Sequence, residues 1–183
     1  MSTVIWHTMM SLDGFVAGPD DTMDWAFSHG GRSALADETR DSIGAILAGR
    51  RWYDVASARY DGVAGIYGGA WTGPVFVLTH RPEDLPDDPT VTVLSDGIED
   101  AVSVARRAED GRAVGVLGAI TAGQVVRAGL LDEIIVHIAP ILLGDGVRFY
   151  GAPGTTATEL ELVERGDSEQ VIDLRYRVRH PAA

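Results

Sequence analysis

Basic side chains follow the predicted end of an apolar strand, and their chemistry suits the binding of an anion. Gly49, Arg50 and Arg51 come directly after a strand predicted over 43–47, and they open a helix predicted over 50–60. The N-terminus of a helix offers free N–H groups, and guanidinium groups present fork-shaped donors that match phosphate oxygens. In a chain of net charge −12, these arginines predict a local positive site. A solvated pair of arginines on a helix surface is the alternative.

A second basic group follows another apolar strand, predicted over 75–78. Thr79, His80 and Arg81 supply a hydroxyl, an imidazole and a guanidinium at the end of that strand. Ligands of open α/β sheets bind outside the carboxyl ends of the strands. We therefore expect both basic groups to converge on one phosphate-sized site, for example for the 2′-phosphate of NADP. An ordinary exposed loop after the strand is the alternative.

Small residues follow a third strand, which we predict over 113–117. Gly118 and Ala119, followed by Ile120 and Thr121, connect this strand to the next predicted helix. The lack of side-chain bulk lets a pyrophosphate approach the backbone closely at the start of a helix. The stretch is not the full G-x-G-x-x-G fingerprint, so it argues against a standard Rossmann site. Close packing of the helix on the strand would need the same small residues.

Two acidic residues could donate a proton during a reduction. Hydride transfer to a C=N bond also needs a proton for the nitrogen, and the candidates are Asp13, Asp24 or a water held by either. A carboxyl donates near neutral pH only when burial raises its pKa. The alternative for Asp13 is a structural turn residue that accepts backbone N–H groups. We interpret His7 and His137 as core or cleft histidines, and we do not expect His29 to act.

The composition excludes several classes of site and partner. Cysteine is absent, which excludes disulfides and thiolate metal sites, and we predict no metal site of another kind. All 15 basic residues are arginine, so Schiff-base chemistry and a Walker lysine are excluded. The acidic charge disfavours nucleic acid, and no apolar run approaches the roughly 20 residues of a membrane helix. Without a recognisable signal peptide, we expect a cytoplasmic protein whose partner is a small molecule.

The predicted elements alternate between strand and helix and then end in two strands. This order predicts one domain over 1–183, with a mostly parallel sheet and an antiparallel end. We expect Ser33 to cap the first helix, Ser95 or Asp96 to cap the third, and the glycine-rich loop 61–74 to be functional. The predicted strands are 4–9, 12–17 (as a short strand or tight loop), 43–47, 75–78, 91–94, 113–117, 133–143, 159–165 and 171–179, and the predicted helices are 32–42, 50–60, 95–108 and 121–128.

Five stretches, in this order, make the chain resemble the dihydrofolate reductase-like superfamily. The resemblance is to the branch related to the reductase domain of riboflavin biosynthesis (the RibD C-terminal domain), and it runs from about residue 4 to 179. It implies a three-layer α/β fold with a mostly parallel central sheet, an antiparallel C-terminal hairpin and helices on both faces. The five stretches are 10–17, 47–51, 75–81, 129–133 and 139–146.

The resemblance also implies a place for NADPH along the carboxyl edge of the sheet. Gly118 and Ala119 fall where the family has a glycine pair beside the pyrophosphate, often joined by a cis bond. The residues expected at the adenosine phosphates are Gly49, Arg50, Arg51, Thr79, His80 and Arg81. Those assigned to the rest of the cofactor are Val16 and Ala17 near the nicotinamide, with Ile120 and Thr121 after the glycine position. Those assigned to substrate are Met9, Ser11 and Trp25.

Departures from the family pattern concern the substrate. Gly30 stands where folate-reducing members have a carboxylate, and 73–74 is Gly-Pro where they have an arginine. Leu117 stands where riboflavin reductases carry a glutamate, and Ala119 replaces the second glycine of the pair. Neither dihydrofolate nor the riboflavin intermediate is therefore expected.

Two hypotheses of function follow. The first is an NADPH-dependent reductase that transfers a hydride to a small pterin-like or pyrimidine-like heterocycle. The alternative is a nucleotide-binding or dimerising module of the same fold without turnover, and a flavin or deazaflavin cofactor also stays open. We expect a homodimer, because the apolar strand 133–143 would otherwise leave an exposed edge or face.

Overall fold

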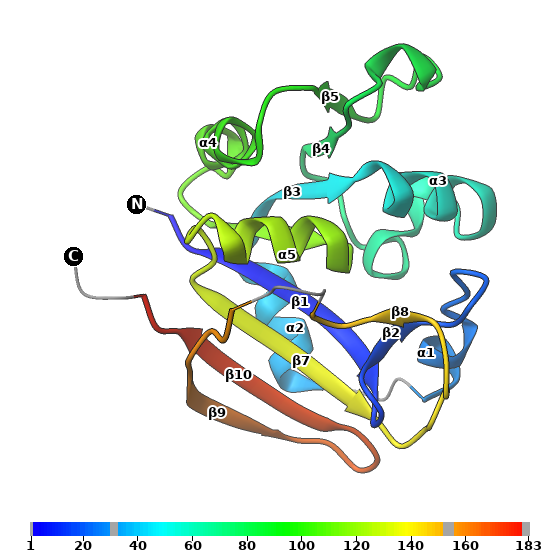
Figure 1. Cartoon of the computed structure of the whole chain (residues 1–183), viewed down its shortest axis with the longest axis vertical. Helices are drawn as coiled ribbons and strands as arrows, with labels where there is room; N and C mark the ends of the chain where they lie inside the picture. Colours follow the sequence, from blue (N-terminus) through cyan, green and yellow to red (C-terminus); the bar gives the residue numbers. More distant parts are fainter. Residues whose placement is uncertain (1, 30–32, 152–155, 181–183) are drawn as a thin grey trace.

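An eight-stranded sheet forms the centre of the protein (Figure 1). The computed structural model describes residues 2–29, 33–151 and 156–180. The first six strands in the spatial order run parallel, and the last two are antiparallel to their neighbours, as predicted. In spatial order the strands are β5 (Thr92–Leu94), β4 (Val75–Leu78), β3 (Ile43–Gly49), β6 (Ala113–Leu117), β1 (Val4–Ser11), β7 (Glu133–Ala139), β10 (Ile172–Val178) and β9 (Leu160–Asp167).

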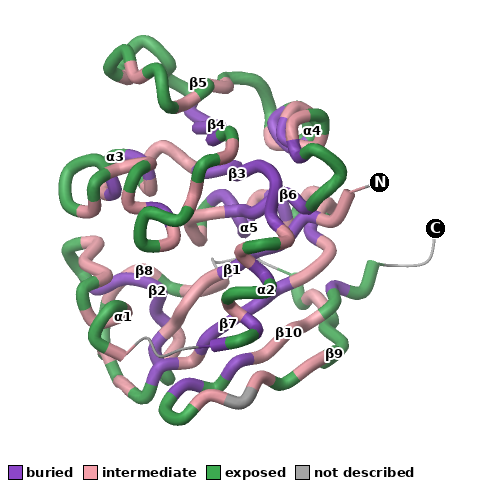
Figure 2. Tube along the Cα trace, turned by 180° about the vertical axis from the view of Figure 1, so that it is seen from behind, coloured by how far each residue is buried: buried purple, intermediate pink, exposed green. Residues whose placement is uncertain are grey.

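Helices cover both faces of the sheet, which confirms the predicted three-layer fold. Alternate side chains of a strand point to opposite faces. Val4 and Trp6 of β1 pack in the apolar core with α4 (Ile98–Ala108) and α5 (Ala119–Arg127). Ile5 packs on the other side against Leu35 of α2 (Ala34–Ser42). Figure 2 shows the buried residues gathered along the central strands, between these helix layers.

The helix boundaries match the predictions at some caps and not at others. Ser33 caps α2 by accepting the N–H of Ala36 at 3.0 Å, as predicted. Helix α4 ends at Ala108 as predicted, but the predicted N-cap was wrong, because the N-cap is Gly97 rather than Ser95 or Asp96. The other helices are α1 (Asp24–His29), which was not predicted, α3 (Arg50–Arg59), and the short 3₁₀ segments η1 (Gly62–Gly69) and η2 (Pro82–Asp84). No described helix is long and apolar enough to cross a membrane.

A small second sheet lies beyond the carboxyl end of β1 (Figure 1). It pairs β2 (Phe15–Ala17) with β8 (Val147–Arg148), and β8 was not predicted. The prediction for β7 was too long, because the strand ends at Ala139, just before Pro140. Proline has no N–H to donate to a ladder, which explains the stop.

The apolar strand β7 lies in the interior of the sheet, between β1 and β10. The reason given for a homodimer was therefore wrong, because β7 leaves no edge exposed. The edges of the sheet are β5 and β9. A dimer argument has to start from one of these edges.

Candidate functional site

A cavity of about 420 Å³ lies at the carboxyl edge of the sheet. It lies on the side of the molecule where β3 leads into α3, away from the two chain ends (Figure 1). All the residues assigned to the cofactor from the sequence line this cavity. They are Val16, Ala17, Gly49, Arg50, Arg51, Thr79, His80, Arg81, Gly118, Ala119, Ile120 and Thr121.

The parallel order β4-β3-β6 explains this convergence. Adjacent parallel strands end at the same edge, so the segments that follow them meet there. Gly49, at the end of β3, lets α5 lie close to this strand, because a Cβ at this position would lie 2.2 Å from Thr121 Oγ1. Gly118 has φ +88°, a conformation that favours glycine, and a Cβ there would lie 3.3 Å from Trp52 Cβ.

Two helix N-termini open into the cavity. The N-cap residues of α3 and α5 are Gly49 and Gly118, and neither helix receives a hydrogen bond from a capping side chain of the described residues. Their first N–H groups are therefore free to bind an anion, aided by the positive ends of both helix dipoles. The cavity can accept a phosphate or pyrophosphate at this end.

Carboxylates partly offset the positive charge of the three arginines that line the cavity. Each of the three forms an ion pair with a nearby carboxylate, so a phosphate must compete with or share these partners. One buried donor has no partner: Arg50 Nη1 finds no acceptor among the described residues. The ion pairs are Arg50–Asp54 at 2.7 Å, Arg51–Asp21 at 2.7 Å and Arg81–Asp84 at 3.4 Å.

The two predicted proton donors do not line the cavity. Asp13 accepts hydrogen bonds from Ser11 Oγ at 2.6 Å and from the N–H groups of Leu143 and Gly144 at 3.1 and 2.7 Å. Led by the bond from Ser11, these bonds lower the pKa of Asp13 to about 2, against the rise that proton donation needs. Asp13 is a turn residue here, as the alternative reading held. Asp24 is exposed and accepts the Tyr60 hydroxyl at 3.0 Å.

Only one of the three residues assigned to substrate lines the cavity. Met9 lines the cavity, whereas Ser11 and Trp25 do not. Ser11 is fully buried, and its hydroxyl donates to Asp13 and accepts the N–H of Phe15. The hydroxyl of Ser11 is therefore engaged within the turn after β1.

The structure describes some of the positions that depart from the family pattern, but not all of them. Leu117 lines the cavity, so the missing glutamate leaves an apolar wall there. The bond between Gly118 and Ala119 is trans, as are all peptide bonds among the described residues. Gly30 lies outside the described residues.

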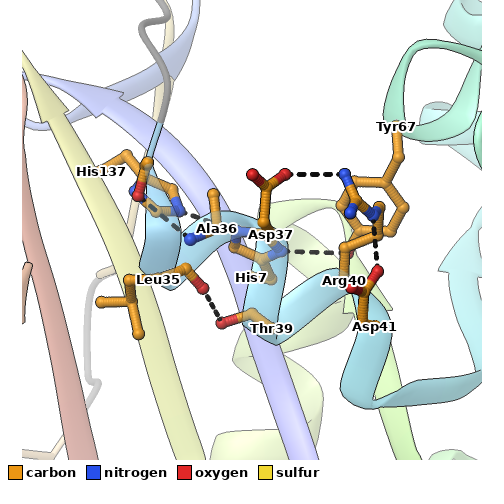
Figure 3. Close-up of polar contacts among 10 residues, drawn as sticks. His7, Leu35, Ala36, Asp37, Thr39, Arg40, Asp41, Tyr67 and His137 are labelled. Carbon is orange, nitrogen blue, oxygen red and sulfur yellow. Dashed lines mark hydrogen bonds and ion pairs between the residues drawn. The ribbon is translucent and has the colours of Figure 1, made fainter.

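His7, interpreted from the sequence as a core or cleft histidine, lies in the cavity wall, but its contact with His137 was not predicted. Figure 3 shows this side chain between His137 and Tyr67, beside α2. Burial is the main cause that lowers the pKa of His7 to about 3; the nearby His137 lowers it further, and Asp173 opposes both. The available signal was a pair of histidines on two buried strands, but only the pairing of β1 with β7 brings them together.

Comparisons with known proteins agree with the fold. The chain is 24% identical, over 94% of its length, to the uncharacterized protein YwjB of Bacillus subtilis, of which 95% is covered. A putative riboflavin biosynthesis protein from Shewanella superposes with a TM-score of 0.78 at 20% identity, covering 98% of this chain and all of that one. The dihydrofolate reductase of Enterococcus faecalis, complexed with NADP(H), superposes with a TM-score of 0.57 at 13% identity, covering 97% of each chain.

These superpositions show a dihydrofolate reductase-like fold, which is the fold of known reductases. A family model adds a closer assignment, because the model of the RibD C-terminal domain matches residues 2–172. The matched region runs from before β1 to the first residue of β10, and the chain therefore belongs to the RibD C-terminal domain family.

Proposed function

We propose that the protein is an NADPH-dependent reductase that transfers a hydride to a small heterocycle, pterin-like or pyrimidine-like. The observation that supports this proposal is that all the residues assigned to the cofactor line one cavity. Its phosphate end has two open helix N-termini and basic side chains. When bound, a reduced nicotinamide supplies the hydride.

The apolar part of the cavity wall suits a flat, weakly polar ligand. Val16 and Ala17 of β2 line it, together with Met9 and Val147. Apolar walls with a few polar groups are typical of small-molecule sites. The absence of the folate and riboflavin anchors argues for a heterocycle without a charged tail.

A nucleotide-binding module without turnover is the second candidate. The loss of the family's substrate anchors, with Gly30 and Leu117 at those positions, favours it, because a site without them can bind a nucleotide without turning over a substrate. A titration with NADPH followed by a panel of reducible heterocycles separates the two. Binding with turnover supports the reductase, and binding without turnover of any compound supports the module.

The titration has a simple optical readout, since Trp52 lines the cavity. NADPH is expected to quench its fluorescence at micromolar concentrations, and Arg51→Ala should weaken the binding. Arg107→Ala is the matched control, because this arginine lies on α4 and bonds to Ser103. Lack of quenching at millimolar NADPH would contradict both candidates, and a parallel titration with a flavin tests the other cofactor class.

A further inference from the structure

Both ring nitrogens of His7 are engaged inside the protein, although this side chain lines the cavity (Figure 3). The hydroxyl of Tyr67 on η1 lies 3.0 Å from His7 Nδ1, and Nε2 of His137 on β7 lies 2.7 Å from His7 Nε2. An imidazole has one hydrogen-bonding site on each nitrogen, and these two contacts occupy both sites. A ligand in the cavity therefore meets ring carbon at His7, without a free donor or acceptor.

The partners of His7 are themselves held in place. His137 Nδ1 lies 2.5 Å from Oδ1 of Asp173 on β10, and the other oxygen of Asp173 accepts the hydroxyl of Ser168. His7, His137 and Asp173 are all buried. Rotation of the His7 ring would leave buried polar atoms without partners, which is costly. The hydrogen-bonded chain from Tyr67 to Asp173 thus holds the His7 ring in one orientation.

The ring that faces the cavity carries no charge near neutral pH. Burial is the main cause that lowers the pKa of His7 to about 3. His7 therefore offers no positive charge to an anionic group of a ligand. A carboxylate or phosphate placed against this ring would lose its water without gaining a partner, and such burial is unfavourable.

Neighbouring residues extend the same kind of wall. Met9 follows two positions after His7 on β1, so the two side chains point to the same face of the sheet, and both line the cavity. Trp52 of α3 also lines the cavity, and it packs, like Tyr67, on the apolar cluster around Ile46. Sulfur atoms and aromatic rings both make favourable contacts with a flat ring. This part of the wall therefore suits an aromatic ligand.

We infer that His7 is a specificity-determining residue, which selects a ligand with an uncharged flat ring at this wall of the cavity. Tyr67, His137 and Asp173 act through His7 as positioning residues. The inference rests on the proposed reductase function, in which this ring is the hydride acceptor. It also narrows the substrate class, because the part of the heterocycle that lies against His7 carries neither a charge nor a hydrogen-bonding group.

NMR of the wild-type protein, with and without NADPH, tests the inference without any substitution. The probe is pterin near pH 6, where this flat ring is uncharged. Pterin is expected to shift the C–H protons of the His7 ring through its ring current, while the two nitrogen-15 signals of that ring keep their positions. Unshifted C–H protons at millimolar pterin, or a new hydrogen bond at either nitrogen, would overturn the inference.

Two substitutions separate the ring from its nitrogens. His7→Phe keeps a flat carbon ring, so pterin should bind with nearly the wild-type affinity. His7→Ala removes the ring and should weaken binding about three- to tenfold, the range that aromatic pairs contribute. His180→Ala is the matched control, since this histidine lies beside Asp132 before β7 and outside the cavity lining. Equal losses in His7→Phe and His7→Ala would show that the nitrogens bind the ligand. Should His7→Phe fail to fold, the NMR of the wild-type protein decides.

The charge of the ligand is tested through its own ionisation, since pterin becomes an anion at alkaline pH. Tyr67 and Asp173, which end the chain, keep their charge states over this range. Burial raises the pKa of Tyr67, although Arg40 of α2 opposes the rise. Against the effect of burial, hydrogen bonds led by that from His137 hold the pKa of Asp173 below its ordinary value. Ionised pterin should bind at least about tenfold more weakly, because the anion loses its water against carbon. Equal affinities would contradict the selection of an uncharged ring.

The role of His7 and the reductase proposal can fail separately. Titration with NADPH tests the reductase and does not involve His7. Pterin that shifts the His7 C–H protons in a protein without affinity for NADPH would support the wall and remove the reductase. NADPH binding together with unshifted His7 protons would do the reverse.

Discussion

Asp13 shows how one carboxylate can hold two loops together rather than perform chemistry. Its hydrogen bonds tie the turn after β1 to residues 143–144, which precede β8. Both segments frame the cavity, because β2 and β8 contribute to its wall. The effect of Asp13 on a ligand is therefore indirect.

Asp13→Asn is expected to destabilise the protein near neutral pH and to leave NADPH binding almost unchanged. The folded pKa of about 2 lies below the ordinary 3.8, so the ionised side chain stabilises the fold above pH 4. This contribution is lost as the pH falls through about 2. Melting temperatures of both proteins should therefore differ at pH 6 and converge towards pH 2. A constant difference across this range would contradict the assignment.

The ion pair between Arg51 and Asp21 limits the charge that a cofactor phosphate meets. Both residues line the cavity. Removing the carboxylate frees the guanidinium, and exposed pairs of this kind are worth about 0.2–1 kcal/mol. Asp21→Asn should therefore tighten NADPH binding about two- to fivefold, and NADH binding should change less.

Asp110→Asn controls for the change in net charge, because this residue lies in the turn between α4 and β6. Isothermal titration of both cofactors against the variants gives the comparison. Weaker NADPH binding by Asp21→Asn would mean that Asp21 positions Arg51 for the phosphate rather than competing with it.

At this scale, the sequence predicted positions better than it predicted chemistry. Gly49, Arg51 and Thr79 were placed correctly, because strand ends and parallel order suffice to bring them together. The carboxylate partners of the arginines were not predicted, because an ion pair such as Arg51–Asp21 depends on how the two side chains lie in the folded protein. The choice between the two roles of Asp13 could not be made from the sequence, since its backbone partners come from about 130 residues further along the chain.

Among the elements, the pair of β2 and β8 depends on one glycine. Gly146 has φ +137°, and a Cβ there would lie 2.1 Å from the carbonyl oxygen of Ala17. A backbone oxygen cannot rotate away as a side chain can, so the two segments would have to separate. Ala17 and Val147 would then leave the cavity wall.

Gly146→Ala is expected to lower stability by about 2–4 kcal/mol, from the unfavourable φ and the clash together, and to weaken NADPH binding. Gly144→Ala is the control, since it has φ +76° but no atom within 4 Å of its Cβ position. This variant should lose only about 1–2 kcal/mol. Urea unfolding measures both, and equal losses would show that the close contact with Ala17 has no cost.

Elements with a strong local pattern were predicted, and those that depend on distant partners were not. The buried strands β3, β4 and β6 are recognisable in the sequence as apolar runs. The short β8 has two residues and pairs with a strand about 130 positions earlier, so it leaves no local signal. Helix α1 buries none of its six residues, and an amphipathic pattern is therefore absent.

On the scale of the whole molecule, the two faces of the sheet have different contents. The face under α4 and α5 buries an apolar core. The face under α2 buries His7, His137 and Asp173 among its apolar residues. Buried polar groups are tolerated only when their partners are complete, and the chain from Tyr67 to Asp173 meets this condition. The first face thus holds an apolar core, whereas the second also holds a buried hydrogen-bonded chain of titratable side chains.

The free edge at β9 gives a physical reason to expect a homodimer. Leu160, Leu162 and Val163 are each more than 40% exposed on this edge strand. An edge strand offers unpaired backbone groups, and exposed apolar side chains beside it favour pairing with another copy. Sedimentation is expected to show a species of twice the 19.5 kDa chain. Leu162→Glu should yield the monomer, whereas Leu142→Glu, at an exposed site in the loop after β7, should not. A wild-type protein that sediments as a single chain at high concentration would rule out this interface.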